Sequence, residues 1–323
     1  MIDRRAFARG AALAPLAIAR ARGEPAWPDR VIRIIVPFAA GAFTDVSARL
    51  LVTELAEELG QSVIVENRGG AGSVLGTTAV VRAAPDGYTL LLTDTSLSIS
   101  PGLYPDLAYD PLRDLAQISR VALSPSILLV RPDLGVRTLA ELVALGRQRP
   151  GEVSFGSGGP GSSAHLAMEL MLDVAGIRGQ HVPFRGVAAA ITEIMAGRVD
   201  MVIASLAAGV AQVKAGTLLG LALSADQRSP LLPQVPTFAE AGLPAYRMMF
   251  WWGLAAPAGT PGGIVERLNY AVNVACAKPR LRAAFAQQAA IAAPSTPEEM
   301  TALLTREIAL WKGVIARTKV TAQ

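Results

Sequence analysis

A buried strand, a glycine-containing loop and a helix follow one another twice in this chain, at residues 31–59 and again at 153–175. The first strand, Val31–Pro37, is apolar at all but one position, which is typical of a strand covered on both faces. The helix after it, Thr44–Leu59, keeps its leucines near one face and meets a glycine at its end. This alternation predicts βαβ units in a mostly parallel sheet. Its recurrence predicts two similar α/β lobes, and 323 residues suit two domains.

The rest of the chain continues the alternation, except for a proline-rich segment at 227–242 that predicts a loop. We expect further strands at 62–66, 88–92, 126–130, 153–155, 181–184, 201–203 and 249–256. We expect further helices at 73–84, 138–147, 162–175, 187–195, 261–277, 279–288 and 297–316.

Residues 1–21 have the pattern of an export signal. Arg4, Arg5 and Arg9 form a basic segment, an uncharged run of ten residues follows, and Ala19-Arg20-Ala21 offers a cleavage site. The paired arginines resemble a twin-arginine (Tat) signal, although Ala8 replaces the usual Leu, so both the Tat and the Sec route stay open. The alternative is an amphipathic helix of a cytoplasmic protein. We expect cleavage near Ala21 and a mature protein in the periplasm.

The formal charge of +4 and the pI near 9.5 first suggest a nucleic-acid partner. Residues 1–21 carry four arginines and one aspartate, and removing them leaves 26 basic and 25 acidic residues. The surplus therefore belongs to the export signal, and we expect no nucleic-acid partner. A single cysteine, Cys276, excludes an internal disulfide, and with only two histidines beside it we expect no Cys/His metal site.

The loop after the first strand, Pro37–Asp45, is a candidate ligand site. In an open α/β sheet, ligands bind beyond the carboxyl ends of the strands. The small residues at 39–42 expose backbone N–H groups just before a helix, an arrangement that suits a carboxylate. The alternative is an ordinary turn in which Asp45 caps the helix.

The loop of the second unit, Phe155–Ser163, contains a G-x-G-x-x-G pattern and is the second candidate site. The pattern raises the alternative of an exported dinucleotide-dependent oxidoreductase. However, it lies in mid-chain, no acidic residue follows the next strand to hold a ribose, and an exported protein lacks a ready nicotinamide supply. The chain also lacks G-x-S-x-G, H-E-x-x-H and Walker A motifs. We therefore expect neither an enzyme nor a cofactor.

Four further side chains allow two interpretations each. His165 could donate to a bound anion or fill a polar gap, and Arg185 could pair with a ligand carboxylate or remain solvated. The pair Trp251-Trp252 favours a core position over ligand stacking.

Taken in order, short motifs along almost the whole chain resemble those of the substrate-binding proteins of tripartite tricarboxylate transporters, the Bug receptors. The matching segments are Trp27–Arg30, Ile34–Phe38, Gly41 with Thr44-Asp45, Val65–Arg68, Gly70–Gly72, Ala84–Leu90, Leu103-Tyr104, Tyr109–Pro111, Gly161–Ser163, His165-Leu166, His181–Gly186, Arg228–Pro230, Val235–Thr237, Glu240–Gly242 and Ala256–Pro261.

This resemblance implies a two-lobed, type II-like Venus flytrap that closes on a di- or tricarboxylate, an acidic amino acid or an aromatic acid. It divides the mature chain into a first lobe, 22–125 and 246–323, and a second lobe, 126–245. It also implies a monomer that delivers its ligand to the membrane permease subunits of the transporter. The alternative is a sensor that presents the ligand to a histidine kinase.

The resemblance also implies that the two loops clasp the ligand carboxylate, and we extend the candidate site to neighbouring strand ends. The candidate ligand-binding residues are Phe38, Ala39, Gly41, Ala42, Phe43, Thr44, Asp45, Thr95, Ser96, Ser157, Gly158, Ser162, Ser163, His165, Arg185 and Ser205.

Four positions depart from the family pattern. Ala42 stands where a second glycine is common, and it would be strained if that position needs a positive φ. Phe43 replaces a small residue, which either narrows the pocket or favours an aromatic or branched acid. Ala204-Ser205 replaces an acidic or amide residue, which argues against amino-acid ligands.

Overall fold

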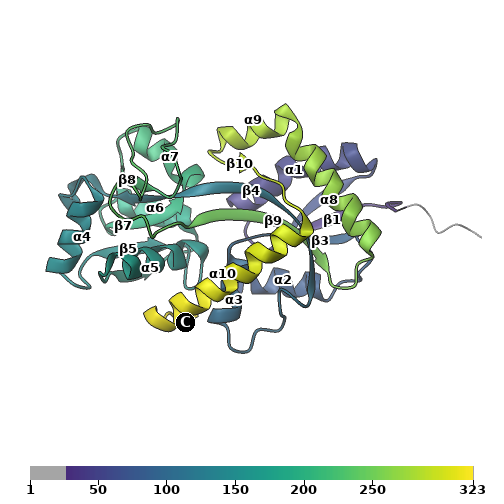
Figure 1. Cartoon of the computed structure of the whole chain (residues 1–323), viewed down its shortest axis with the longest axis horizontal. Helices are drawn as coiled ribbons and strands as arrows, with labels where there is room; N and C mark the ends of the chain where they lie inside the picture. Colours follow the sequence, from purple (N-terminus) through teal and green to yellow (C-terminus); the bar gives the residue numbers. More distant parts are fainter. Residues whose placement is uncertain (1–26, 323) are drawn as a thin grey trace, which may run out of the picture.

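The computed structural model describes residues 27–322 as two α/β lobes side by side (Figure 1). The expected export signal, 1–21, lies outside the described residues. No helix of residues 27–322 is both long enough and apolar enough to cross a membrane.

The first lobe is built on a sheet with the strand order β2-β1-β3-β9-β4. Strands β1 (Ile32–Val36), β2 (Val63–Asn67) and β3 (Thr89–Asp94) are parallel, as the βαβ pattern predicts. Strand β9 (Met249–Pro257) lies antiparallel between β3 and β4 (Leu115–Val130). The short β10 (Ile291–Ala292) also pairs with β4.

The helices of this lobe cover both faces of the sheet. One group, in which α1 packs against α8 and α9, consists of α1 (Phe43–Leu59), α8 (Gly262–Ala277) and α9 (Pro279–Gln287). The opposite group consists of α2 (Val74–Val81), α3 (Ser96–Leu103) and α10 (Pro297–Thr318), with a 3₁₀ turn at Ala71–Ser73.

The second lobe continues the same sheet beyond the middle of β4. Residues 126–130 of β4 pair antiparallel with β7 (Met201–Ser205) and β8 (Leu219–Leu223). Strands β5 (Ser154–Ser157) and β6 (Gln180–Pro183) extend the sheet in parallel from β7. The helices are α4 (Leu139–Gln148), α5 (Ser163–Ala175), α6 (Val187–Met195) and α7 (Leu206–Lys214), with a 3₁₀ turn at Pro132–Leu134.

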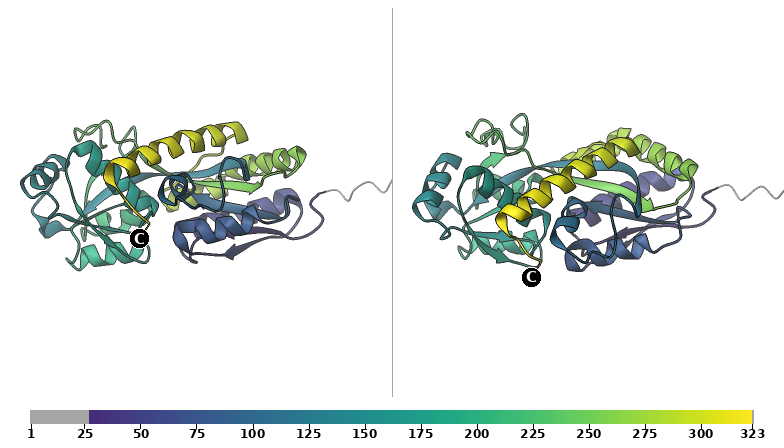
Figure 2. Two further views of the ribbon diagram at one scale, coloured as in Figure 1. Left: turned by 90° about the horizontal axis from the view of Figure 1, so that it is seen from below. Right: turned by 60° about the horizontal axis from the view of Figure 1, so that its bottom comes forward.

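Two long elements join the lobes. Strand β4 runs from one lobe into the other, and helix α10 starts on the first lobe and ends beside α5 of the second (Figure 2). Arg317 near the end of α10 donates to the Asp173 carboxylate on α5 at 2.9 Å. The lobes are thus connected both through the sheet and across the helical layer.

The sequence pattern missed α3, α7, β8 and β10 and predicted only the second part of β4. Helix α3 reads SLSISPGL, a polar pattern with a proline, yet its first five residues are all buried. The Ser98 hydroxyl donates to the Thr95 carbonyl at 2.7 Å, and the Ser100 hydroxyl to the Ser96 carbonyl at 2.8 Å. Because these serines bond their own backbone, they are buried at little cost.

Candidate functional site

The carboxyl ends of strands from both lobes converge on one short stretch of β4. Asp94, the last residue of β3, is in register with Trp252 of β9, which is in register with Ala122 of β4. Four residues further along β4, Ser126 is in register with Ser205, the last residue of β7. Loops that follow these strands therefore approach the crossing between the lobes, where a ligand of an α/β sheet is expected.

The first candidate loop joins β1 to α1 through Gly41, whose φ of +85° favours glycine. Ala42 begins the helix at φ −64°, so its methyl group causes no strain and the missing second glycine has no backbone consequence. No side chain caps the helix at Ala42. The first-turn N–H groups of α1 are thus available to an anion.

Asp45 organises this loop. Its carboxylate accepts the Gly41 N–H at 2.9 Å, the Arg49 guanidinium at 3.0 Å and the Asn67 side-chain amide at 3.0 Å. The same Asn67 amide donates to the Phe38 carbonyl at 3.1 Å. Burial works against the charge, but these hydrogen bonds outweigh it and hold the pKa of Asp45 below its usual value. The charge of Asp45 is therefore satisfied by the loop, by α1 and by the end of β2.

Phe43 and Thr44 form the inner side of the loop. The Phe43 ring lies 4.3 Å from the Trp252 ring, centroid to centroid. The Trp252 indole donates to the Thr44 hydroxyl at 3.1 Å, and that hydroxyl lies 3.5 Å from the Asp94 carboxylate. Trp252 is buried, as the sequence predicts for the tryptophan pair, and it packs against the inner side of the candidate loop.

Thr95 and Ser96 follow β3 and are both buried. The Thr95 hydroxyl accepts the Trp251 N–H at 3.3 Å, and the Ser96 hydroxyl donates to the Ser73 hydroxyl at 3.0 Å. Their hydroxyl groups are thus bonded inside the first lobe.

In the second candidate loop, Ser157 is held by its neighbours. Its hydroxyl lies 2.6 Å from His181 Nε2 and accepts the Gly159 N–H at 3.1 Å. The Ser162 hydroxyl accepts the His165 N–H at 3.3 Å and so caps α5. Gly158 and Ser163 lie half-buried on either side of this turn.

The two histidines brace the loop. Their rings stack with centroids 3.7 Å apart and planes 11° apart, and His165 Nδ1 accepts the Gly161 N–H at 3.1 Å. His165 is buried, with Nε2 at 3.6 Å from the Glu169 carboxylate. Burial, with the neighbouring His165, lowers the pKa of His181 to about 4. His165 therefore positions the loop by accepting the backbone N–H of Gly161.

Arg185 and Ser205 complete the second lobe's contribution. Phe184 donates its N–H to the Ser157 carbonyl at 3.2 Å, which places Arg185 beside the loop. Within residues 27–322 the exposed Arg185 guanidinium makes no ion pair, and the half-buried Ser205 hydroxyl caps nothing at the start of α7. Both side chains are available to a ligand.

The two lobes touch at Gly161. A Cβ atom at this position would lie 1.9 Å from Leu103 Cδ2 of α3. At Gly156 it would lie 2.9 Å from the Ala190 Cβ. Packing explains these glycines, and the segment after β6, Phe184-Arg185-Gly186, offers no acidic group for a ribose. The dinucleotide interpretation gains no support.

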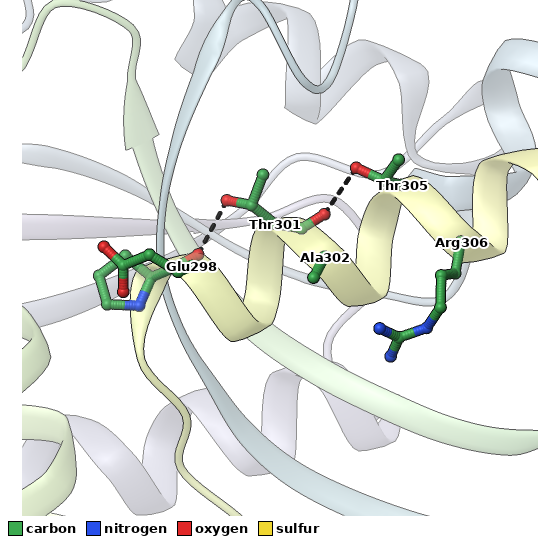
Figure 3. A pocket seen from close by; sticks show the side chains of 6 residues that line it. Glu298, Thr301, Ala302, Thr305 and Arg306 are labelled. Atoms are coloured by element: carbon green, nitrogen blue, oxygen red, sulfur yellow. Dashed lines mark hydrogen bonds between the residues drawn. The ribbon is translucent and has the colours of Figure 1, made fainter.

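The surface hollow shown in Figure 3 lies on α10 and is lined by Pro297, Glu298, Thr301, Ala302, Thr305 and Arg306. Thr301 and Thr305 each donate to a backbone carbonyl of their own helix at 2.8 Å. Their hydroxyls are therefore occupied, and the hollow lacks convergent polar groups. Residues 27–322 contain no cluster of three or more His, Cys, Asp or Glu side chains suited to a metal.

Sequence reasoning missed Asp94 and Asn67, and it placed Trp252 in the core without its contacts to the loop. Asp94 ends a buried strand, so the strand-end rule that selected Thr95 and Ser96 could have selected it as well. Asn67 and Trp252 reach the loop only through tertiary contacts, which no local pattern reports.

The chain forms two α/β lobes that are connected by strands, and the candidate loops follow strand ends in both lobes. This arrangement defines a periplasmic-binding-protein fold. The family described as "Tripartite tricarboxylate transporter family receptor" matches residues 47–320. The chain belongs to this family of solute-binding receptors.

The relatives agree over nearly full length. Protein BugT of Bordetella pertussis is 37% identical over 311 residues, covering 96% of this chain and 95% of BugT. The periplasmic binding protein BugD is 30% identical, with a TM-score of 0.82 over 91% of this chain and 99% of its own.

Two solved relatives hold acids. MatC from Rhodopseudomonas palustris, with bound malate, is 32% identical and superposes with a TM-score of 0.81, covering 90% of this chain and 100% of its own. R. palustris Rpa4515, with adipate, is 32% identical with a TM-score of 0.84, covering 91% of this chain and 99% of its own.

Proposed function

We propose that this protein is a periplasmic receptor that captures a small organic carboxylate between its lobes and delivers it to the permease subunits of a tripartite tricarboxylate transporter. The observation that carries the proposal is the uncapped N-terminus of α1 behind Gly41. It offers several N–H donors to one anion, and Asp45, the acidic residue of its first turn, is already bonded to Gly41, Arg49 and Asn67. The malate and adipate held by two relatives agree with this chemistry.

The ligand contacts are assigned as follows. The α1 N-terminus, with Phe38–Asp45, forms the first half of the site, and the segment Ser157–Ser163 forms the second half. Arg185 pairs with a carboxylate of the ligand, and Ser205 donates to it. Asp45, Ser157 and His165 act mainly by shaping the two loops, because their polar atoms are already bonded.

The ligand class follows from the aromatic and ionisable groups at the two halves of the site. Phe43 packed on Trp252 gives the first half an aromatic wall that suits an aromatic or branched acid. Ala204 and Ser205 leave the end of β7 without an acidic group for an ammonium. We therefore favour simple carboxylates over amino acids.

Binding is tested by thermal shift and calorimetry of the mature protein against malate, adipate, citrate, benzoate and glutamate. At least one acid without an amino group should raise the melting temperature and bind with 1:1 stoichiometry. Arg185→Ala should weaken the binding of that acid about tenfold, as expected for loss of a charged hydrogen bond. The control Arg82→Ala, at an exposed α2 end, should not.

Delivery is tested with the permease subunits in proteoliposomes. Uptake of the bound acid should depend on added receptor. Export is tested separately by mass spectrometry of the mature N-terminus, which should begin near residue 22.

A further inference from the structure

Asp94 is a buried acid at the carboxyl edge of the first lobe. Its Oδ1 accepts the Ser96 N–H at 2.9 Å, and its Oδ2 faces the Thr44 hydroxyl at a long 3.5 Å. Asp94 keeps 9% of its surface exposed, whereas Thr93 and Thr95 on either side keep 1% and 0%. Of these three residues at the end of β3, it keeps the largest exposed fraction.

No cationic side chain of residues 27–322 forms an ion pair with Asp94. In the first turns of α1 the ionisable groups are Asp45 and Arg49, which pair with each other. On β1 the one ionisable residue, Arg33, reaches Thr89 at the opposite end of β3. The packed elements β9 and α3 contribute no ionisable side chain, because MFWWGLAAP and SLSISPGL contain none. Among the described residues, a charge at Asp94 is thus supported by hydrogen bonds from Ser96 and Thr44 and by no cation.

An anionic Asp94 conflicts with the ligand chemistry of the loop beside it. Thr44, which faces Asp94, lies in the first turn of α1, whose N–H groups are placed to receive a carboxylate. Two negative charges so close in a partly dry site repel each other strongly. A shared proton removes the repulsion and adds a hydrogen bond.

Resting on the function proposed above, we propose that Asp94 is a specificity-determining group that donates a hydrogen bond, in its neutral form, to the bound carboxylate. Oδ2 carries the proton, since Oδ1 is occupied by the Ser96 N–H. Burial, which raises the pKa of Asp94, favours this form. When Asp94 is ionised in the free protein, binding takes up one proton from the solvent.

The experiment is calorimetry of the wild type and Asp94→Asn with malate, adipate, citrate, benzoate and glutamate from pH 5.5 to 8.5, in two buffers of different ionisation enthalpy. The wild-type Kd should rise up to tenfold per pH unit above the pKa of Asp94 in the free protein. Proton uptake should appear as a buffer-dependent enthalpy. Asparagine also donates from this position, so Asp94→Asn should bind with nearly constant affinity across this range and without proton uptake.

Asp106→Asn, an exposed aspartate outside the site, is the matched control and should behave as the wild type. Melting temperatures at each pH verify that every variant is folded. The proposal is overturned if the wild-type affinity is independent of pH, or if a folded Asp94→Asn keeps the wild-type pH dependence. It is equally overturned if Asp94→Asn selectively loses an amino-bearing ligand such as glutamate, because Asp94 would then act as an anion. Absence of binding to every acid by the wild type would refute the proposed function itself.

Discussion

The Asp45 carboxylate accepts the Gly41 N–H at 2.9 Å, so the first turn of α1 holds the loop that precedes it. Arg49 and Asn67 bond the same carboxylate and fix its direction. The loop conformation is therefore maintained by an acid that is itself neutralised. A carboxylate site can contain such an acid without repelling its ligand.

Asp45→Asn should weaken ligand binding about tenfold and destabilise the protein by about 1–2 kcal/mol, because the charged hydrogen bonds to Arg49 and Gly41 are lost or weakened. Folding lowers the pKa of Asp45, so the ionised side chain stabilises the folded protein at neutral pH. This stabilisation is lost as the pH falls below the pKa of Asp45 in the unfolded chain and through its pKa in the folded protein. In urea unfolding, the wild type should exceed Asp45→Asn in free energy of unfolding by less at pH 3 than at pH 7. Asp86→Asn, a solvent-accessible partner of Arg30, is the control; an equal effect there would contradict this role.

Gly161→Ala should be more damaging than Gly176→Ala. Both glycines have a positive φ, +71° and +65°, so backbone strain is similar. Only at Gly161 does a Cβ meet another residue, Leu103, at 1.9 Å; nothing lies within 4 Å at Gly176. We expect Gly161→Ala to cost about 1–3 kcal/mol more in thermal unfolding. Leu103→Ala in the same chain should recover part of the difference, and no recovery would show that the contact between the lobes is unimportant.

His181 should make the protein less stable in mild acid. Burial and the nearby His165 lower the pKa of His181 to about 4, so the unfolded chain binds the proton first. Stability should fall as the pH drops from about 6.5 toward 4 and level off below that. Denaturation midpoints of His181→Gln should change less with pH over this window than those of the wild type. The exposed neighbour Gln180→Ala should keep the wild-type slope.

Glu307 links three elements of the first lobe from α10. Its carboxyl group accepts the Trp251 indole at 2.7 Å and the Ser98 hydroxyl at 2.8 Å. Glu307→Ala should cost about 2–3 kcal/mol because the Trp251 indole loses its acceptor and the Ser98 hydroxyl keeps only the Thr95 carbonyl, whereas Glu307→Gln should cost less. Burial raises the pKa of Glu307, so its contribution to stability falls as the pH rises through the window between the unfolded and folded values. Tryptophan fluorescence during urea unfolding measures both effects; equal losses in the two variants would refute the role of the hydrogen bonds.

Local patterns predicted the units that carry the two loops. Strand β1 with α1, and β5 with α5, were expected within one or two residues, because buried strands and amphipathic helices have clear periodicities. The loops could be selected as candidate sites because ligand position in α/β sheets follows strand ends.

Long-range contacts explain what the sequence concealed. Strand β4 crosses both lobes, and its first part, LAQISRVALSP, mixes polar and apolar residues because the partners on its two sides differ. The roles of Asn67 and His181 depend on residues 22 to 29 and 24 positions away, respectively. Spacing along the chain cannot indicate such contacts.

The most direct measurement of the central claim is calorimetry of the mature protein with an acid and its neutral amide, such as adipate and adipamide or malate and malamide. The account predicts 1:1 binding of at least one acid of the panel and no detectable binding of its amide, because the N-terminus of α1 and Arg185 select a negative charge. Equal binding of acid and amide, or no binding of any acid tested, would contradict the account.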